Sequence, residues 1–275
     1  MTLPSTPSIL LAGCGKLGGA LLDGWLASPT PPKIVVLDRH RTGSDDTLTI
    51  ANSPAEIPTS FTPDIIVLAV KPAGADKTIE DIGKALGSRF EKSALLSVMA
   101  GRTCEALASA AAQAGAEIPV LRAMPNTPSA IGAGISGFYA PPSATTEQAT
   151  LCHELLFAVG DVVRVKKEED LLAVTAVSGS GPAYVFLLAE LLEKAGEAHG
   201  LSKETARRLA RGTIYGAGRM LDDLPDDAED LRKAVTSPNG TTAAALSVLM
   251  APDAWPANIA KAIDAATKRA DELAG

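Results

Sequence analysis

The chain has few aromatic residues and an excess of acidic over basic side chains. Aromatic residues make up 4% of its 275 residues, whereas glycine and alanine are plentiful. This composition favours close-packed helices and pockets built from backbone over aromatic stacking platforms. The formal net charge of −7 argues against nucleic acid or an anionic membrane surface as the main partner.

Cysteine is also scarce, and no apolar run approaches the length needed to cross a bilayer. Cys14, Cys104 and Cys152 are odd in number, widely spaced and form no CxxC pair, which is typical of reduced cytosolic thiols. The first residues, MTLPSTPSILLAG, lack the basic region of a signal peptide. We therefore expect a soluble, cytoplasmic protein with no membrane partner.

The sequence offers little for hydrolytic or metal chemistry. His40, His153 and His199 fall on a loop and on polar helix faces, where a surface position is expected. No Ser-His-Asp arrangement and no metal-ligand spacing emerges, so we expect no metal site.

The first part of the chain alternates short apolar runs with amphipathic segments, which predicts a mostly parallel sheet covered on both faces by helices. The expected strands are Ser8–Ala12, Lys33–Asp38, Asp64–Val70, Ala94–Val98, Val120–Met124 and Val162–Val165. The expected helices are Leu17–Ala27, Ala75–Phe90, Thr103–Ala114 and Glu147–Val159. From Glu168 onward every periodic segment is helical, so we expect an α/β domain at residues 1–166 and an all-helical domain at residues 167–275. A helical remainder of this size is expected to bury its apolar faces against a second subunit.

One stretch of the helical part, AVSGSGPAYVF at residues 176–186, breaks the helical periodicity on either side. A glycine inside a helix costs about 1 kcal/mol and a proline about 3 kcal/mol. Such a break marks either a functional site, where another molecule approaches the backbone, or a tight helix crossing. The segment alone does not decide between them.

A glycine-rich turn follows the first expected strand and opens the first helix. Gly13, Gly15 and Gly18 form G-x-G-x-x-G in the strand-to-helix context of a dinucleotide-binding loop. Gly13 would permit the tight turn, Gly15 the approach of a pyrophosphate, and Gly18 close packing of helix on strand. The helix N-terminus would attract the diphosphate. The first domain is therefore expected to be a Rossmann-type doubly wound fold.

The end of the second strand leaves the choice between NAD and NADP open. Asp38 favours NAD, because an acidic residue there accepts the ribose 2′-hydroxyl group. Arg39 and Arg41 favour NADP, since they can pair with a 2′-phosphate, although both also suit a solvated loop. We expect NADP or NAD as cofactor, with a slight preference for NADPH.

Six segments, in order along the chain, together resemble the pyrroline-5-carboxylate reductases, which make proline in the last step of its synthesis. They are the glycine loop, AVKP at 69–72, SVMAG at 97–101, RAMPNTP at 122–128, the helix break and TSPNGTT at 236–242. The resemblance implies reduction of 1-pyrroline-5-carboxylate, a small imine, to L-proline with NADPH or NADH. It also implies that the helical domain serves dimerisation, in a homodimer or larger homo-oligomer.

The resemblance also implies roles for individual residues. Thr242 would be catalytic, through a hydrogen bond to the ring nitrogen of the imine. The substrate would be bound by Ser178, Ser180, Gly181, Pro182, Ser237, Asn239, Gly240 and Thr241. The cofactor would be bound by Gly13, Gly15, Lys16, Leu17, Gly18, Asp38, Arg39, Ala69, Val70, Lys71, Pro72, Ala100, Gly101 and Asn126.

Three of these segments also suit purely structural roles. Lys71 suits a solvated loop end, and Asn126 suits a turn in which it bonds local backbone. TSPNGTT suits a plain interhelical loop with an N-cap at Thr241 or Thr242. Arg122 is interpreted as a structural ion-pair partner, not as a substrate clamp.

The chain departs from the family pattern in two places. Asn239 stands where the family usually has a second glycine, but asparagine tolerates left-handed conformations. Between Thr42 and Ser60 the usual full helix is missing, and only TGSDD precedes a short strand candidate, TLTIA. This second departure concerns the adenosine side of the cofactor site.

Two other functions compete with the reductase. A β-hydroxyacid dehydrogenase has a similar Rossmann domain followed by helices, but it places a catalytic lysine in the helical domain. Lys194 and Lys203 lie in amphipathic helix or cap contexts, which argues against that function. A non-catalytic dinucleotide-sensing or scaffold protein would keep the fold without the reaction.

Overall fold

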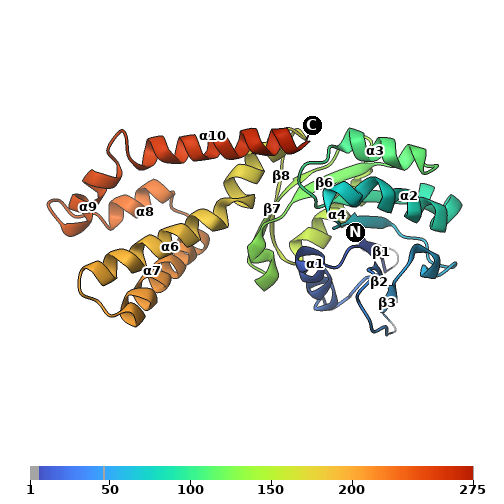
Figure 1. Cartoon of the computed structure of the whole chain (residues 1–275), viewed down its shortest axis with the longest axis horizontal. Helices are drawn as coiled ribbons and strands as arrows, with labels where there is room; N and C mark the ends of the chain where they lie inside the picture. Colours follow the sequence, from blue (N-terminus) through green and yellow to red (C-terminus); the bar gives the residue numbers. More distant parts are fainter. Residues whose placement is uncertain (1–5, 46, 275) are drawn as a thin grey trace. The chain divides into compact units, whose positions relative to one another are not determined.

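The computed structural model describes residues 6–45 and 47–274 (Figure 1). The expectation drawn from the first five residues, that no basic targeting region is present, falls outside the described part of the chain. The chain forms two compact units, one of residues 6–179 with 266–274 and the other of Ser180–Ala265.

The first unit is built around a sheet of eight strands in the order β3-β2-β1-β4-β5-β6-β7-β8. Neighbouring strands are parallel except β6 and β7, which run antiparallel. The strands are β1 Ser8–Ala12, β2 Lys33–Leu37, β3 Leu48–Ala51, β4 Ile65–Leu68, β5 Ala94–Ser97, β6 Val120–Met124, β7 Gly134–Tyr139 and β8 Gly160–Arg164. The order of the first six is that of a Rossmann-type doubly wound sheet, so the expected fold class is confirmed.

Helices cover both faces of this sheet, as the continuous apolar strands require. On one face, α1 Lys16–Leu26 and α4 Thr146–Phe157 bury leucines against the strands, and the indole N–H of Trp25 donates to the Leu155 carbonyl oxygen at 2.8 Å. On the other face lie α2 Ala75–Leu86 and α3 Cys104–Gln113. The 3₁₀ turns of the first unit are Pro54–Glu56, Pro72–Gly74, Gly87–Lys92 and Thr127–Ile131.

The second unit is helical, as predicted. Its helices are α6 Gly181–Ala198, α7 Lys203–Asp223, α8 Ala228–Ala234, α9 Thr241–Leu249 and the first part of α10 Trp255–Ala274. Ser202 caps α7, because its hydroxyl group accepts the N–H of Thr205 at 3.2 Å. Of the apolar side chains of this unit, Ala206 and Ala210 are buried.

The helix break has an unusual backbone. α5 Asp170–Val174 continues into a π-helical turn at Thr175–Gly179, and α6 begins at Gly181. Residues 167–179 belong to the first unit, which contains the sheet. The boundary between functional domains near residue 166 stays a prediction.

Candidate functional site

The glycine loop between β1 and α1 has the shape that a diphosphate needs. Gly13 has φ +89°, and a Cβ there would lie 2.8 Å from the carbonyl oxygen of Ala69, so only glycine fits. Gly18 is buried against the carbonyl group of Gly13. A Cβ at Gly15, in contrast, would meet no protein atom within 4 Å. Packing thus explains Gly13 and Gly18, whereas Gly15 leaves open the space that a pyrophosphate would take.

The helix behind the loop has free N–H groups for an anion. α1 begins at Lys16 with no side-chain cap and no acidic residue in its first turn. Uncapped N–H groups and the positive end of the helix dipole attract a phosphate group. Lys16 is exposed, whereas the Leu17 side chain packs against the core, so Leu17 has only its backbone to offer a cofactor.

Asp38 joins the end of β2 to the glycine loop. One carboxylate oxygen accepts the N–H of Cys14 at 2.8 Å, and the other accepts the N–H of His40 at 2.9 Å. Partial burial acts to raise the pKa of Asp38, but the N–H donors of His40 and Cys14 outweigh it and hold the pKa below its usual value. The carboxylate is therefore ionised and fixed in place at neutral pH.

A cavity of about 490 Å³ opens beside Asp38, at the carboxyl ends of the strands. Four predicted cofactor residues line it, namely Gly13, Asp38, Arg39 and Val70. An open sheet of this type binds its ligand at that edge. An open loop, an anion-binding helix end and an adjacent cavity together fit a nicotinamide dinucleotide.

The same cavity is lined by residues that the sequence did not reveal, Asn52, Ser53 and Lys77. The amide nitrogen of Asn52 donates to the backbone oxygens of Asp38 and Arg41, each at 2.8 Å. Asn52 directly follows β3, and parallel strands end at a common edge. That rule, applied to the strand candidate TLTIA, would have placed Asn52 at the same edge of the sheet as Asp38.

The neighbouring strands contribute two further predicted turns. After β4, Ala69 lies beneath Gly13, while Lys71 and Pro72 are exposed at the start of a 3₁₀ turn. After β5, Ala100 is exposed and Gly101 has φ +70°, with the Leu273 carbonyl oxygen 2.5 Å from where a Cβ would lie.

Asn126 follows β6 and joins the sheet to the helix break. Its amide nitrogen donates to the Ser178 carbonyl oxygen at 3.2 Å, and its amide oxygen accepts the N–H of Ile135 at 3.0 Å. The structure thus brings Ser178, a predicted substrate residue, next to a predicted cofactor residue.

The loop TSPNGTT lies in the second unit, at the start of α9. Asn239 has φ +58°, so asparagine adopts the left-handed conformation that the family's glycine would take. Gly240 is the N-cap residue, packed against the Ser237 hydroxyl group, and it leaves the first N–H groups of α9 without a side-chain cap. Thr241 is exposed at the first helical position and Thr242 is half-buried at the second. This end of α9 can therefore hold a small carboxylate.

The predicted residues fall into two groups. The cofactor residues and Ser178 lie in the first unit, whereas Ser180, Gly181, Pro182 and the loop from Ser237 to Thr242 lie in the second. The meeting of the two groups around one substrate stays a prediction.

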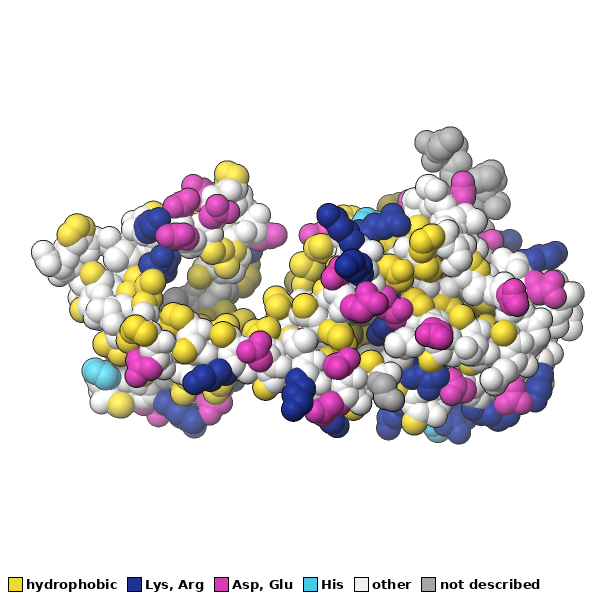
Figure 2. Space-filling view, turned by 90° about the horizontal axis from the view of Figure 1, so that it is seen from above, with side chains coloured by type: hydrophobic (Ala, Val, Ile, Leu, Met, Phe, Trp, Pro, Cys, Tyr) yellow, Lys and Arg dark blue, Asp and Glu magenta, His cyan; other side chains and the backbone are white. Residues whose placement is uncertain are grey.

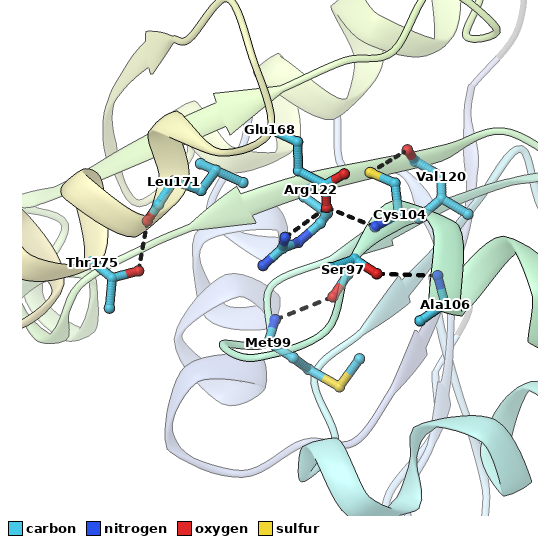
Figure 3. Close-up of polar contacts among 10 residues, drawn as sticks. Ser97, Met99, Cys104, Ala106, Val120, Arg122, Glu168, Leu171 and Thr175 are labelled. Carbon is cyan, nitrogen blue, oxygen red and sulfur yellow. Dashed lines mark hydrogen bonds and ion pairs between the residues drawn. The ribbon is translucent and has the colours of Figure 1, made fainter. Parts of the chain in front are cut away.

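Arg122 forms the ion pair that the sequence analysis assigned to it (Figure 3). Its guanidinium group lies 2.7 Å from a carboxylate oxygen of Glu168, and the same oxygen accepts the N–H of Cys104 at 2.6 Å. Burial, and then the negative charge of Glu168, raise the pKa of the Cys104 thiol to about 12. These contacts link β6, α3 and the start of α5, and they leave Cys104 a neutral thiol.

Other candidate catalytic groups lie apart from this edge. Lys194 pairs with Glu190 one turn earlier on α6, and Lys203 is exposed at the start of α7, so neither supports a dehydrogenase lysine. Among residues 6–45 and 47–274, no group of three His, Cys, Asp or Glu side chains could hold a metal ion.

Two family models match the chain. Residues 168–273 match the model for pyrroline-5-carboxylate reductase dimerisation. Residues 8–101 match the model described as NADP oxidoreductase, coenzyme F420-dependent.

Individual relatives match over almost the whole length. The pyrroline-5-carboxylate reductase of Pseudomonas aeruginosa is 37% identical over 98% of both chains. The solved pyrroline-5-carboxylate reductase of Coxiella burnetii superposes with a TM-score of 0.86 at 32% identity, over 98% of this chain and 100% of that one. The Plasmodium falciparum pyrroline carboxylate reductase, solved with NADP bound, gives a TM-score of 0.80 at 26% identity over 98% of both chains.

Proposed function

Because the chain belongs to the pyrroline-5-carboxylate reductase family, we propose that it reduces 1-pyrroline-5-carboxylate to L-proline with NADPH or NADH. The observation that carries this proposal is the match to such reductases, at 37% identity over 98% of both chains. The proposed reaction is the last step of proline synthesis, and the enzyme is an NAD(P)H-dependent imine reductase.

The cofactor would be held by the first unit. Gly13, Gly15 and Gly18 would receive the diphosphate at the N-terminus of α1, and Asp38 and Arg39 would face the adenosine ribose. Arg39 adds a guanidinium group to the same cavity, which supports a preference for NADPH over NADH, whereas the charge of Lys77 is paired with Asp81 at 2.7 Å on the cavity wall.

The proposed reaction requires little acid or base catalysis by the protein. When bound, the reduced nicotinamide supplies a hydride to the imine carbon. A protonated C=N carbon is already electrophilic, so no separate strong acid is required at that step. The chain's part is to bind the substrate carboxylate at the free N–H groups of α9 and to orient the ring nitrogen through the Thr242 hydroxyl group.

The test is cofactor oxidation on addition of pyrroline-5-carboxylate, run with NADPH and NADH in parallel. We expect turnover with both cofactors and a lower KM for NADPH. The control is a β-hydroxyacid with NADP⁺, for which we expect no reduction of the cofactor. Binding of either cofactor without oxidation would favour the sensor or scaffold function, and the proposal would be wrong.

We further propose that the protein is a homodimer or larger homo-oligomer. Large apolar side chains of α6, among them Phe186 at 67% and Leu191 at 53% exposure, are uncovered in the single chain. Figure 2 shows such hydrophobic side chains gathered on the surface of the helical unit. Apolar surface of this extent is typical of a protein interface.

The expectation that no apolar run approaches the length needed to cross a bilayer is corrected by one helical stretch of the described residues. Asp170–Ala198 is long and apolar enough to cross a membrane by length and composition alone, and only 11% of its most apolar part is buried within the chain. The stretch contains the Ser178–Pro182 break and lies within the segment that matches the dimerisation model. We therefore propose a second copy, not lipid, as the cover of this helix. Because a second copy rather than lipid would cover this helix, we also propose a cytoplasmic location.

A further inference from the structure

The π-helical turn at Thr175–Gly179 lies at the boundary between the two compact units of the chain. It ends where the first compact unit ends, and Ser178 within it is a proposed substrate residue. π turns inside helices are rare and are found mostly at functional sites. Hydroxyl groups bond backbone oxygens one turn earlier, Thr175 to Leu171 at 2.7 Å and Ser178 to Val174 at 3.0 Å.

Side chains from the end of β6 and from the turn after it contact this π turn. The Asn126 amide donates to the Ser178 carbonyl oxygen at 3.2 Å. One residue along, a Cβ on Gly179 would lie 2.9 Å from the terminal methyl group of Met124, so the two segments approach closely. The amide oxygen of Asn126 is fixed in turn by the N–H of Ile135 in β7, at 3.0 Å.

This arrangement needs a donor and an acceptor on one short planar group, a demand that asparagine meets. A carboxylate would keep the acceptor for Ile135 and lose the donor to Ser178. An apolar side chain would lose both. The amide oxygen and one of the two N–H groups of Asn126 are thus engaged within the chain, which fixes the orientation of the amide.

We propose that Asn126 is a positioning residue, whose hydrogen bond to the Ser178 carbonyl oxygen holds the π turn in the shape that receives the imine substrate. The inference rests on the proposed function and deepens it. It assigns Asn126 to the substrate through Ser178, and the test decides between this role and the cofactor contact that the family resemblance implies.

The test compares Asn126→Asp, which keeps the acceptor alone, with Asn126→Leu, which keeps neither group. We expect both variants to raise the KM for pyrroline-5-carboxylate and to lower kcat/KM about tenfold, the effect of losing one hydrogen bond of about 1.4 kcal/mol. The dissociation constant for NADPH, measured by fluorescence titration, should stay within about twofold of the parent value. Only Asn126→Asp adds a negative charge, whereas both variants lack the donor to Ser178. An equal fall of kcat/KM in both variants would therefore be due to the missing donor.

Trp25→Phe is the matched control. It removes a buried side-chain donor to a backbone oxygen, the 2.8 Å bond to Leu155, at the C-terminal end of α1, opposite the end that would receive the diphosphate. We expect Trp25→Phe to lower the melting temperature about as much as the Asn126 variants do. Its KM values for pyrroline-5-carboxylate and for NADPH should stay unchanged. A general loss of stability therefore cannot mimic the Asn126 effect.

Hydrogen exchange of the full-length protein without ligands tests the contact independently of activity. In both Asn126 variants the amides of Thr175–Gly179 should exchange at least several-fold faster, while those of α2 and α3 keep their rates. Unchanged exchange in this turn, or a weaker NADPH affinity with an unchanged KM for the imine, would overturn the inference. If the parent protein oxidises no cofactor with the imine, the proposed function fails, and the exchange result still decides whether Asn126 holds the turn.

Discussion

Two glycines of one loop are expected to respond differently to the addition of a methyl group. Gly13→Ala forces a left-handed φ of +89° on an L-residue and places its Cβ 2.8 Å from a backbone oxygen. We expect it to lower the free energy of unfolding by about 2 kcal/mol. Gly15→Ala meets no protein atom within 4 Å and has φ −72°, so its stability should stay within about 0.5 kcal/mol of the parent.

The Gly15 variant should instead weaken cofactor use, because its methyl group occupies the space left for the pyrophosphate. We expect the apparent KM for NADPH to rise about tenfold, as measured by initial rates. Urea unfolding of both variants provides the stability comparison. An unchanged KM in Gly15→Ala would mean that the pyrophosphate binds elsewhere.

Thr242 tests the proposed contact with the ring nitrogen. Thr242→Val keeps the branched shape at the second position of α9 and removes the hydroxyl group. We expect kcat to fall about tenfold or more with little change in NADPH affinity, because one oriented hydrogen bond is lost where the reaction occurs. Thr242→Ser restores a hydroxyl group and should recover most of the rate. Full activity in the valine variant would remove Thr242 from the mechanism.

At the level of strands and helices, continuous apolar runs made most of the sheet predictable from sequence. β1 and β6 have the predicted bounds, because strands buried on both faces read as short, mainly apolar runs, SILLA and, apart from Arg122, VLRAM. β7, GISGFY, escaped prediction because it carries Gly134, Ser136 and Gly137. A Cβ on Gly137 would lie 2.5 Å from a methyl group of Val174, so close helix packing selects glycine over a β-former.

The helix break and the adenosine side show what sequence patterns leave undetermined. Glycine and proline revealed that the helix breaks near Ser178, but the π turn begins earlier, at Thr175, and its contact with Asn126 joins residues far apart in the sequence. On the adenosine side, Asn52 is placed by the pairing of β3 with β2, a contact that local periodicity does not encode.

The link between β6, α3 and α5 gives a prediction about stability. Glu168→Gln removes the charge that faces the buried guanidinium group of Arg122, whose Nε already lacks a partner. We expect the free energy of unfolding to fall by about 2 kcal/mol, because an unpaired buried charge is costly. Urea unfolding measures it, with the exposed pair variant Glu190→Gln as a control that should lose less than about 0.5 kcal/mol. Equal losses in the two variants would contradict a structural role for the Arg122 pair.

At the scale of the whole molecule, the helical unit buries few of its apolar side chains within the single chain. Of its apolar side chains, Ala206 and Ala210 are buried, whereas Phe186, Leu187 and Tyr215 are more than half exposed. A helical unit with so small a buried core gains little stability by itself, which supports the proposal that a second copy supplies the missing burial. The amphipathic pattern of the sequence predicted this need, but not which side chains meet the partner.

Phe186 is the most exposed large apolar side chain of α6, at 67%, and it provides the test of that interface. A buried phenylalanine contributes about 2–3 kcal/mol, and a glutamate in its place would also bring an unpaired charge into the contact. We therefore expect Phe186→Glu to shift the protein from dimer or larger oligomer to monomer in sedimentation equilibrium and to lower the melting temperature. Lys194→Glu, on the solvent-exposed pair of the same helix, should keep the oligomer. A parent protein that is a fully active monomer at micromolar concentration would contradict the proposed assembly, because the apolar surface of α6 would then be stable in water without a partner.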